Sequence, residues 1–532
     1  MRSFIKLSVI TSVPCVPAFY YYTLSDQDKR LARVTVNGFE RFFRSARIGI
    51  LISSDYWWSF RNIEYDNPEY FNIARAVHQR SAERILHGCL KNGGLYIKLG
   101  QGLVNMDHVL PKEYIQTLKV LQDRCLQRKN NELVQLFEEE FGKSYTDMFE
   151  SFTEEPIAAA SLAQVFKAKR KDGVEVAVKV QYIDLRDRFN GDINTVKYLL
   201  KFSGWLFPKY DFSWIIKELE TPLELELDFL AEARNAEKCS RDLSHLDYAY
   251  VPKVFWDQSS HRVLTTEFIY GVKISDVEKL AEENYSLVDV DTKLFTIFAE
   301  QIFHSGFIHA DPHPGNLLVR KLKNGSAEIV ILDHGLYETL PDNFRLSLSH
   351  LWKAVIMNNH TDMKKFSHQL GIADKDYRLF CIALVQKYVP TEKNETEDIM
   401  QMFFKPRVPS VRSPFADLSE EERNKFKVEA AKIHDRLINV FKQLPGKLVL
   451  VCRNLNAIRA IAKIHGNVVD RHSVMAHCAT RNLFHQKDMN FLLRLQQRIL
   501  FELSLWYDSF KRFLLGYILR WFRFNALADA LA

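Results

Sequence analysis

Three side chains that can offer oxygen atoms to a metal or a proton occur in the order and spacing of a phosphoryl-transfer site. Asp311 and Asn316 lie five residues apart, and a second aspartate, Asp333, follows a short apolar run. In sites of this kind the first aspartate accepts or orients the proton of the attacking oxygen, while the asparagine and the second aspartate hold magnesium ions that bridge the phosphates. The pattern predicts binding of ATP with Mg²⁺, with Asp311 catalytic and Asn316 and Asp333 as metal ligands.

A lysine suited to the phosphates of ATP lies upstream. Lys179 falls near the end of the alternating run 174–180, which together with the run 165–168 and a Lys-Asp-Gly turn predicts a β-hairpin. A lysine at the end of such a strand binds the α- and β-phosphates when a carboxylate holds its ammonium group. Taken singly, Lys179 would be a surface residue of an edge strand and Asp311 a turn residue before proline. Their shared order with Asn316 and Asp333 favours the nucleotide site.

Apolar periodicity predicts the elements that position these residues. The chain from Asn316 to Asp333 reads as strand, Asn-Gly turn and strand, so these two side chains should lie close together. Beyond Leu340 the pattern is helical, apart from a polar loop at 390–414. Upstream of the site, helices are expected within 71–125 and over 129–141, 193–207, 215–243 and 292–303.

Composition limits the classes of protein to which the chain can belong. With 532 residues and 47% hydrophobic content it is long enough for more than one folded domain. The net charge of +6 comes without a long basic run, so a nucleic-acid surface is not indicated, whereas a membrane surface stays possible. The seven scattered cysteines form no C-x-x-C pair, which argues against a disulfide framework or a zinc site and predicts that most are buried.

Both termini carry features of membrane or organelle proteins. The first 25 residues contain Arg2 and Lys6 but no acid, and a charge-free run at 7–25 approaches the roughly 20 residues that span a bilayer, although two prolines interrupt it. A mitochondrial targeting segment that also anchors the chain fits best, a buried helix is the plain alternative, and a cleaved secretory signal fits least. The basic, aromatic tail at 491–524 could lie on an anionic membrane or pack back on the chain or a partner.

Five motifs together resemble one family of atypical kinases. They are Lys98-Leu99-Gly100-Gln101, Ala158 to Ser161, Val176 to Lys179, Glu226-Leu227-Asp228 and His309 to Asn316. The chain resembles the UbiB, or aarF-domain-containing, kinases over roughly residues 70–360, and within that family it is most similar to an animal mitochondrial branch.

The resemblance implies an α+β, bilobal protein-kinase-like fold. It implies a targeting or anchor segment at 1–25, a helical N-terminal extension with the K-x-G-Q motif at 26–150, and a kinase-like domain at 151–345 divided near residue 270. A helical continuation at 346–490 and the tail at 491–532 would complete the chain.

The resemblance also assigns roles to residues. Ala158, Ala159, Ala160 and Ser161 match an alanine-rich loop that replaces the usual glycine-rich phosphate loop, and Val165 follows it as a nucleotide contact. Glu232, one and a half helical turns beyond Glu226, matches the acid that pairs with Lys179. Lys98, Gln101, Glu226 and Asp228 match regulatory residues that, in relatives, occupy the space of a protein substrate.

The alanine loop has a physical consequence of its own. Glycine lets the backbone approach phosphates at positive φ, whereas each alanine adds a methyl group that disfavours this. We therefore expect nucleotide binding to differ from that of typical protein kinases. Without the hairpin that follows, the same four residues could equally begin a helix.

Three departures from protein kinases bear on the site and on the expected substrate. His334 stands where phenylalanine is usual after the metal-binding aspartate, so the packing there should differ. His313 replaces a phosphate-facing lysine, and a structural role suits it better than that of a base. No Ala-Pro-Glu segment follows Asp333, so a peptide-docking platform is not expected.

The leading hypothesis is therefore an ATP- and Mg²⁺-dependent atypical kinase or ATPase, acting on a small or lipid-linked molecule. The resemblance places it at the mitochondrial inner membrane, in lipid homeostasis and cristae organisation, with anionic lipids or a membrane protein as partners and no nucleic acid. A protein serine/threonine kinase and a nucleotide-sensing pseudokinase scaffold are the alternatives.

Overall fold

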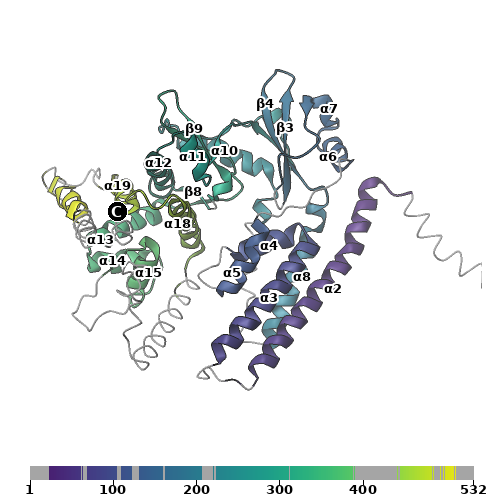
Figure 1. Cartoon of the computed structure of the whole chain (residues 1–532), viewed down its shortest axis with the longest axis horizontal. Helices are drawn as coiled ribbons and strands as arrows, with labels where there is room; N and C mark the ends of the chain where they lie inside the picture. The colour runs from purple at the N-terminus through teal and green to yellow at the C-terminus, as the bar shows by residue number, and fades with distance from the viewer. Residues whose placement is uncertain are drawn as a thin grey trace, which may run out of the picture. The chain divides into compact units, whose positions relative to one another are not determined.

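The computed structural model of the chain forms two compact units (Figure 1). Unit 1 comprises residues up to Leu230 together with Val254–Phe268, and unit 2 comprises Ala231–Lys253 and the chain from Ile269 onward. The structure describes residues 23–61, 63, 69–104, 110–122, 131–159, 162–206, 220, 223–310, 312–387, 389, 440, 444–481, 483, 492, 495–496, 498–507 and 510.

Long helices form the first part of unit 1. Helix α2 (Asp26–Phe60) begins where the Ser25 hydroxyl accepts a hydrogen bond from the Asp28 backbone, and it runs alongside α3 (Tyr70–Asn92) and α8 (Leu185–Leu206), as Figure 1 shows. Gly93, with a φ of 69°, ends α3. Helix α4 (Leu95–Val104), α5 (Lys112–Leu118) and the 3-10 turn η1 (Lys119–Gln122) pack on this frame. The described residues between Asp26 and Gln122 are therefore mainly helical.

An antiparallel sheet forms the second part of unit 1. Helix α6 (Asn131–Phe141) ends at Gly142, whose φ is 66°, as the sequence predicts, and α7 (Tyr145–Met148) leads into the sheet. The strand order is β1-β3-β4-β6, with β2 paired to β3. The strands are β1 (Phe149–Phe152), β2 (Ala158–Ala159), β3 (Ala163–Arg170), β4 (Glu175–Gln181) and β6 (Val263–Glu267).

The predicted hairpin is confirmed by β3 and β4. Gly173, at a φ of 87°, makes the turn possible, and the ladder runs from Ala163 opposite Gln181 to Lys169 opposite Glu175. Val176, Val178 and Val180 are buried against Phe137 and Phe149. Because alternate residues face opposite sides of a strand, Lys179 faces away from this core.

The helix predicted over 215–243 is wrong in its central part. Helix α10 (Phe229–Asp242) begins only after a turn at 226–228, because the backbone NH of Phe229 donates to the His261 carbonyl and the Asp228 carboxylate accepts from the Leu230 backbone. Glu226 and Glu232 therefore do not lie on one continuous helix.

Unit 2 contains a small sheet and a two-stranded ladder. The sheet has the order β5-β10-β9-β7, in which β10 runs parallel to β5 and antiparallel to β9. Its members are β5 (Ala249–Tyr250), β7 (Val272–Lys273), β9 (Leu317–Lys321) and β10 (Ala327–Ile331). Strand β8 (Phe307–His309) pairs with β11 (Tyr337–Thr339). Gly325, with a φ of 81°, turns the predicted hairpin between β9 and β10.

Helices build the rest of unit 2. Helix α12 continues through one π-helical turn, η4, into β8. The helices are α11 (Val277–Glu282), α12 (Leu287–Glu300), η4 (Gln301–Ser305), α13 (Asp342–Ile356), α14 (His360–Gln369), α15 (Tyr377–Val385), α18 (Gly446–Ile464) and α19 (Arg471–Arg481). Short 3-10 turns lie at Trp256–Gln258 (η3, in unit 1) and Pro314–Asn316 (η5).

The cysteines of the described regions are free thiols, most of them buried, as the sequence predicts. Burial raises the pKa of Cys89, Cys239, Cys381 and Cys478 to about 12, so they pack as small apolar residues. Among the described helices none has the length and apolar character needed to cross a bilayer.

Several expectations lie outside the described residues. They concern the segment 1–22, Ala160 and Ser161 of the alanine loop, Asp311, the loop 390–414 and most of the tail beyond residue 484. Of the tail, residues 498–507 are helical, with Phe501 and Leu505 buried and Trp506 exposed. Part of this segment therefore packs back on the chain.

Candidate active site

Asn316 and Asp333 lie side by side in unit 2, as predicted. The β9–β10 ladder places Leu317 opposite Ile331, and the Leu332 backbone NH donates to the Asn316 carbonyl at 2.9 Å, so the two strand ends stay in register. The Asn316 amide nitrogen lies 3.4 Å from Asp333 Oδ2, while the Gly335 backbone donates to Asp333 Oδ1 at 2.9 Å. An amide oxygen and a carboxylate are hard oxygen donors, so this pair fits Mg²⁺.

His334 is a buried structural residue beside Asp333. Its Nε2 donates to the Ile331 carbonyl at 3.0 Å, and its Nδ1 therefore accepts from the Tyr337 hydroxyl at 2.9 Å. Asn235 of α10 donates to the His334 carbonyl at 3.0 Å. Burial raises the pKa of Tyr337 well above its usual value, which keeps the hydroxyl protonated as the donor. Hydrogen bonds replace the apolar contacts that a phenylalanine would make at this position.

Two buried amide side chains hold the start of the candidate catalytic loop. In the β8–β11 ladder His309 lies opposite Tyr337, but these two residues form a non-hydrogen-bonded pair. The ladder hydrogen bond next to them joins the Ala310 backbone NH to the Leu336 carbonyl. The His309 backbone NH donates instead to Gln301 Oε1 at 3.1 Å, and its carbonyl accepts from Asn454 Nδ2 at 2.5 Å. Both amides are buried. We call Gln301 and Asn454 the amide clamp; it acts two residues before Asp311.

Sequence patterns do not reveal the amide clamp. Asn454 lies in the middle of the apolar helix α18, and a polar residue at a core position was the one available signal. Its partner lies 145 residues away in the sequence, so periodicity could not identify it.

His313 caps the turn that carries Asn316. Its Nδ1 accepts a hydrogen bond from the Gly315 backbone at 3.1 Å and so begins the 3-10 turn η5. This contact is the structural role that the sequence favoured for His313.

Unit 1 supplies the second set of candidate residues. Lys179 lies opposite Val165 of β3 and Leu264 of β6, and its ammonium group lies 5.0 Å from the centre of the Phe229 ring. Ala158 and Ala159 form β2 and pair with Val165 and Gln164. These two alanines belong to a strand at the mouth of the β3–β4 hairpin, so a helix does not begin at this point.

The K-x-G-Q helix is α4, and its motif residues have separate contacts. Lys98 forms an ion pair with Glu226 at 2.6 Å, and the Gln101 side chain donates to the Leu121 carbonyl at 2.8 Å. A Cβ added at Gly100 would lie 2.3 Å from Leu121 Cδ1 and 3.2 Å from Cys89 Sγ. The glycine therefore permits close packing of α4 on its neighbours.

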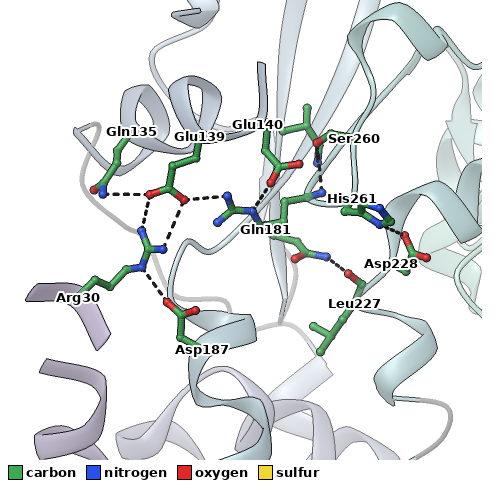
Figure 2. Close-up of polar contacts among 12 residues, drawn as sticks. Arg30, Gln135, Glu139, Glu140, Gln181, Asp187, Leu227, Asp228, Ser260 and His261 are labelled. Atoms are coloured by element: carbon green, nitrogen blue, oxygen red, sulfur yellow. Dashed lines mark hydrogen bonds and ion pairs between the residues drawn. The ribbon is translucent and has the colours of Figure 1, made fainter. Parts of the chain in front are cut away.

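The Glu226–Asp228 segment is attached to the sheet of unit 1. Gln181, at the end of β4, donates to the Leu227 carbonyl at 2.8 Å, and the Asp228 carboxylate lies 2.8 Å from His261 Nδ1 (Figure 2). The strand of Lys179 is therefore bonded to Leu227, the residue between the two acids of the resemblance.

An ion network extends from this segment to the N-terminal helix (Figure 2). Arg262 donates to Glu139 at 2.8 Å and to Glu140 at 2.6 Å, and Arg30 of α2 joins Glu139 at 2.7 Å to Asp187 at 2.8 Å. Burial alone would raise the pKa of Glu139, but hydrogen bonds from Arg30 and Arg262 hold it below its usual value. The network ties α2, α6, α8 and the residue before β6 together, and apolar periodicity does not reveal it.

Of the predicted site residues, the structure therefore places Asn316 in contact with Asp333 and Lys98 in an ion pair with Glu226. Glu232 is buried on α10 in unit 2, whereas Lys179 belongs to unit 1, so their pairing stays a prediction. The catalytic role of Asp311 and the contacts of Ala160 and Ser161 concern residues outside the described part of the chain.

Comparison with known proteins identifies the family. Residues 120–367 match the model of the ABC1 atypical kinase-like domain. The chain is 36% identical to AarF domain-containing protein kinase 1 of Mus musculus, over 90% of this chain and 89% of that protein. It is 37% identical to a probable serine/threonine-protein kinase, abkD, of Dictyostelium discoideum, over 93% of this chain and 69% of that protein.

Among solved structures, the Rv3197 protein of Mycobacterium tuberculosis in complex with erythromycin matches with a TM-score of 0.43 and 22% identity, over 74% of this chain and 97% of that chain. The sequence relatives confirm the resemblance drawn from the five motifs and, with it, the kinase-like α+β fold. The chain belongs to the ABC1, or AarF-domain-containing, family of atypical kinase-like proteins.

Proposed function

We propose that the chain binds ATP with Mg²⁺ and acts as an ATPase or as a phosphotransferase on a small or lipid-linked acceptor. The observation that carries the proposal is the contact between Asn316 and Asp333 at the ends of β9 and β10. Its support is that the pair follows the candidate catalytic loop in kinase order and that the family's members are named as kinases.

Each residue has a defined task in this proposal. Mg²⁺, when bound, neutralises the charge that develops on the phosphates. Asn316 and Asp333 would hold it, and Lys179 would bind the α- and β-phosphates. As the bond between the γ-phosphorus and the bridging oxygen breaks, the attacking oxygen forms the new bond, and Asp311 accepts its proton while ADP leaves. The amide clamp would hold the loop that carries Asp311 in place.

A turnover assay tests this function. Purified full-length chain is supplied with ATP and Mg²⁺, alone and with an added protein acceptor, and both phosphate release and acceptor labelling are measured. Phosphate release that Asp311→Asn abolishes is the expected result. Efficient labelling of the added protein would favour a serine/threonine kinase instead, and ATP binding without any turnover would favour a pseudokinase scaffold.

The proposal extends to location and partners. The basic, acid-free segment before Asp26 supports mitochondrial targeting, and the exposed aromatic side chains of the tail support contact with anionic lipids of the inner membrane. A role in lipid homeostasis and inner-membrane organisation follows from the resemblance. Fractionation of cells that express the full chain or a chain lacking residues 1–25 tests the location; equal mitochondrial recovery of both would contradict the role of this segment.

A further inference from the structure

A basic groove lies between α2 and α3 in unit 1, away from the residues assigned to the nucleotide. It encloses about 510 Å³. Its lining consists of five basic side chains together with Ile48, Leu51, Glu83 and His87. The cationic residues are Arg44 and Arg47 of α2 and Arg80, Arg84 and Lys91 of α3.

Three acids lie in or beside this set of five basic side chains: Glu83 lines the groove, Glu40 pairs with Arg44, and Asp55 pairs with two further arginines. Asp55 holds Arg80 at 2.7 Å and Arg84 at 2.5 Å, and hydrogen bonds from Arg80 chiefly lower the pKa of Asp55 to about 2. One carboxylate therefore faces two guanidinium groups. Within the described regions Arg47 and Lys91 have no hydrogen bond or ion pair, so both cations are available to an anion.

The groove continues into an exposed apolar face of α2. Phe43, Ile50 and Trp57 recur every seven residues and are 67%, 61% and 55% exposed. Arg47 lies four residues after Phe43 and three before Ile50, so it shares their side of the helix. Leu51, four residues after Arg47, belongs to the groove. A ligand anchored by the cations would thus have apolar surface beside it.

We propose that this groove binds the phosphate headgroup of an acidic phospholipid, with the Phe43–Ile50–Trp57 face against the apolar part of the bilayer. Guanidinium groups bind phosphate oxygens through paired hydrogen bonds, and tryptophan is favoured at the boundary between headgroups and acyl chains. A soluble phosphate ester would satisfy the cations but leave the three apolar side chains in water. The lipid satisfies both sets of side chains.

The inference rests on the proposed contact with anionic lipid and names the surface that makes it. It does not involve Lys179, Asn316 or Asp333. Variants of the groove should therefore keep the ATP turnover measured without vesicles, which separates a failure of the groove from a failure of the nucleotide site.

Vesicle flotation of the full-length chain tests the groove. Vesicles contain phosphatidylcholine alone or mixed with phosphatidic acid. The variant Arg47→Gln/Lys91→Gln removes two cations that support no structural ion pair. The control Lys143→Gln/Lys171→Gln removes the same charge from exposed sites of unit 1 that have no hydrogen bond or ion pair in the described regions.

We expect wild type and control to float with phosphatidic acid vesicles and the groove variant to bind roughly twenty-five-fold more weakly, about five-fold for each cation. Trp57→Ser should weaken flotation as well, with an unchanged melting temperature as evidence of folding.

Three results would overturn the inference. Equal binding by the groove variant and the wild type would show that the groove does not bind the lipid, and would leave the proposed contact with anionic lipid elsewhere on the chain untouched. No flotation of the wild type would contradict that contact as well. Full competition by millimolar glycerol 3-phosphate, together with no effect of Trp57→Ser, would assign the groove to a soluble phosphate ester.

Discussion

Replacing Asn454 tests whether the amide clamp positions the catalytic loop. Asn454→Leu keeps the branching of the side chain and its approximate volume but removes the donor to the His309 carbonyl. That carbonyl is not part of the ladder with β11, so the variant removes a buried hydrogen bond that the ladder does not replace. The loss of a hydrogen bond at a buried polar group costs about 1–3 kcal/mol.

The expected effect on stability follows from this cost. For a unit of this size each kcal/mol lowers the melting temperature by about 2–4 °C, so Asn454→Leu should lower it by roughly 2–12 °C. Asn194→Leu, which replaces an exposed asparagine of α8 that has no hydrogen bond in the described regions, is the control, and its effect should stay within about 0.5 kcal/mol.

The effect on turnover should exceed the effect on ATP affinity. A displacement of about 1 Å in a catalytic group can lower the rate about a hundred-fold. We therefore expect Asn454→Leu to lower kcat by about ten- to a hundred-fold and to leave the affinity for ATP about unchanged. Thermal melting, ATP binding and turnover are measured on the same preparations. A lower melting temperature with unchanged kcat would show that the clamp only stabilises the fold and would refute its positioning role.

Three further predictions concern stability. His465 and Asp291 are fully buried and 2.6 Å apart; burial opposes the charged imidazole, but the bond to Asp291 outweighs it and raises the pKa of His465. The pair therefore contributes fully to the free energy of unfolding below about pH 6.5, and this contribution is lost as pH rises through the raised pKa. Asp291→Asn should lower the free energy of unfolding by about 3–5 kcal/mol at about pH 6 and by less at about pH 9. The same loss at both pH values would contradict the prediction. A double-mutant cycle of Lys98→Ala and Glu226→Ala, followed by urea unfolding, should give a coupling of up to about 1 kcal/mol, since both side chains are partly exposed, and no coupling would dismiss the ion pair. Gly100→Ala should destabilise unit 1 by about 1–3 kcal/mol despite the higher helix propensity of alanine, and the shorter side chain of Leu121→Ala should reduce that penalty; a more stable single variant would refute the close packing.

Local patterns predicted the features that depend on neighbouring residues. The β3–β4 hairpin follows from alternating valines and a Lys-Asp-Gly turn, and the contact of Asn316 with Asp333 follows from the short β9–β10 hairpin between them. In both cases a few residues fix the backbone, so sequence periodicity suffices.

Features that depend on distant partners escaped prediction. The helix expected over 215–243 was wrong because the Phe229 backbone NH bonds to His261, a contact invisible to periodicity. Arg30 and Glu139 are 109 residues apart, and Asn454 and His309 are 145 apart. Such pairs form only after the elements have packed, so the sequence shows a polar residue without its partner.

Binding calorimetry with and without Mg²⁺ tests the central claim, that Asn316 and Asp333 form a magnesium site for ATP. Asp333→Asn keeps an acceptor for the Gly335 backbone but removes the negative charge, so the fold should persist. The wild type should bind ATP at least about ten-fold more tightly with Mg²⁺ than without, and Asp333→Asn should lose this dependence. Equal dependence on Mg²⁺ in both proteins, or no binding of ATP by the wild type, would contradict the claim.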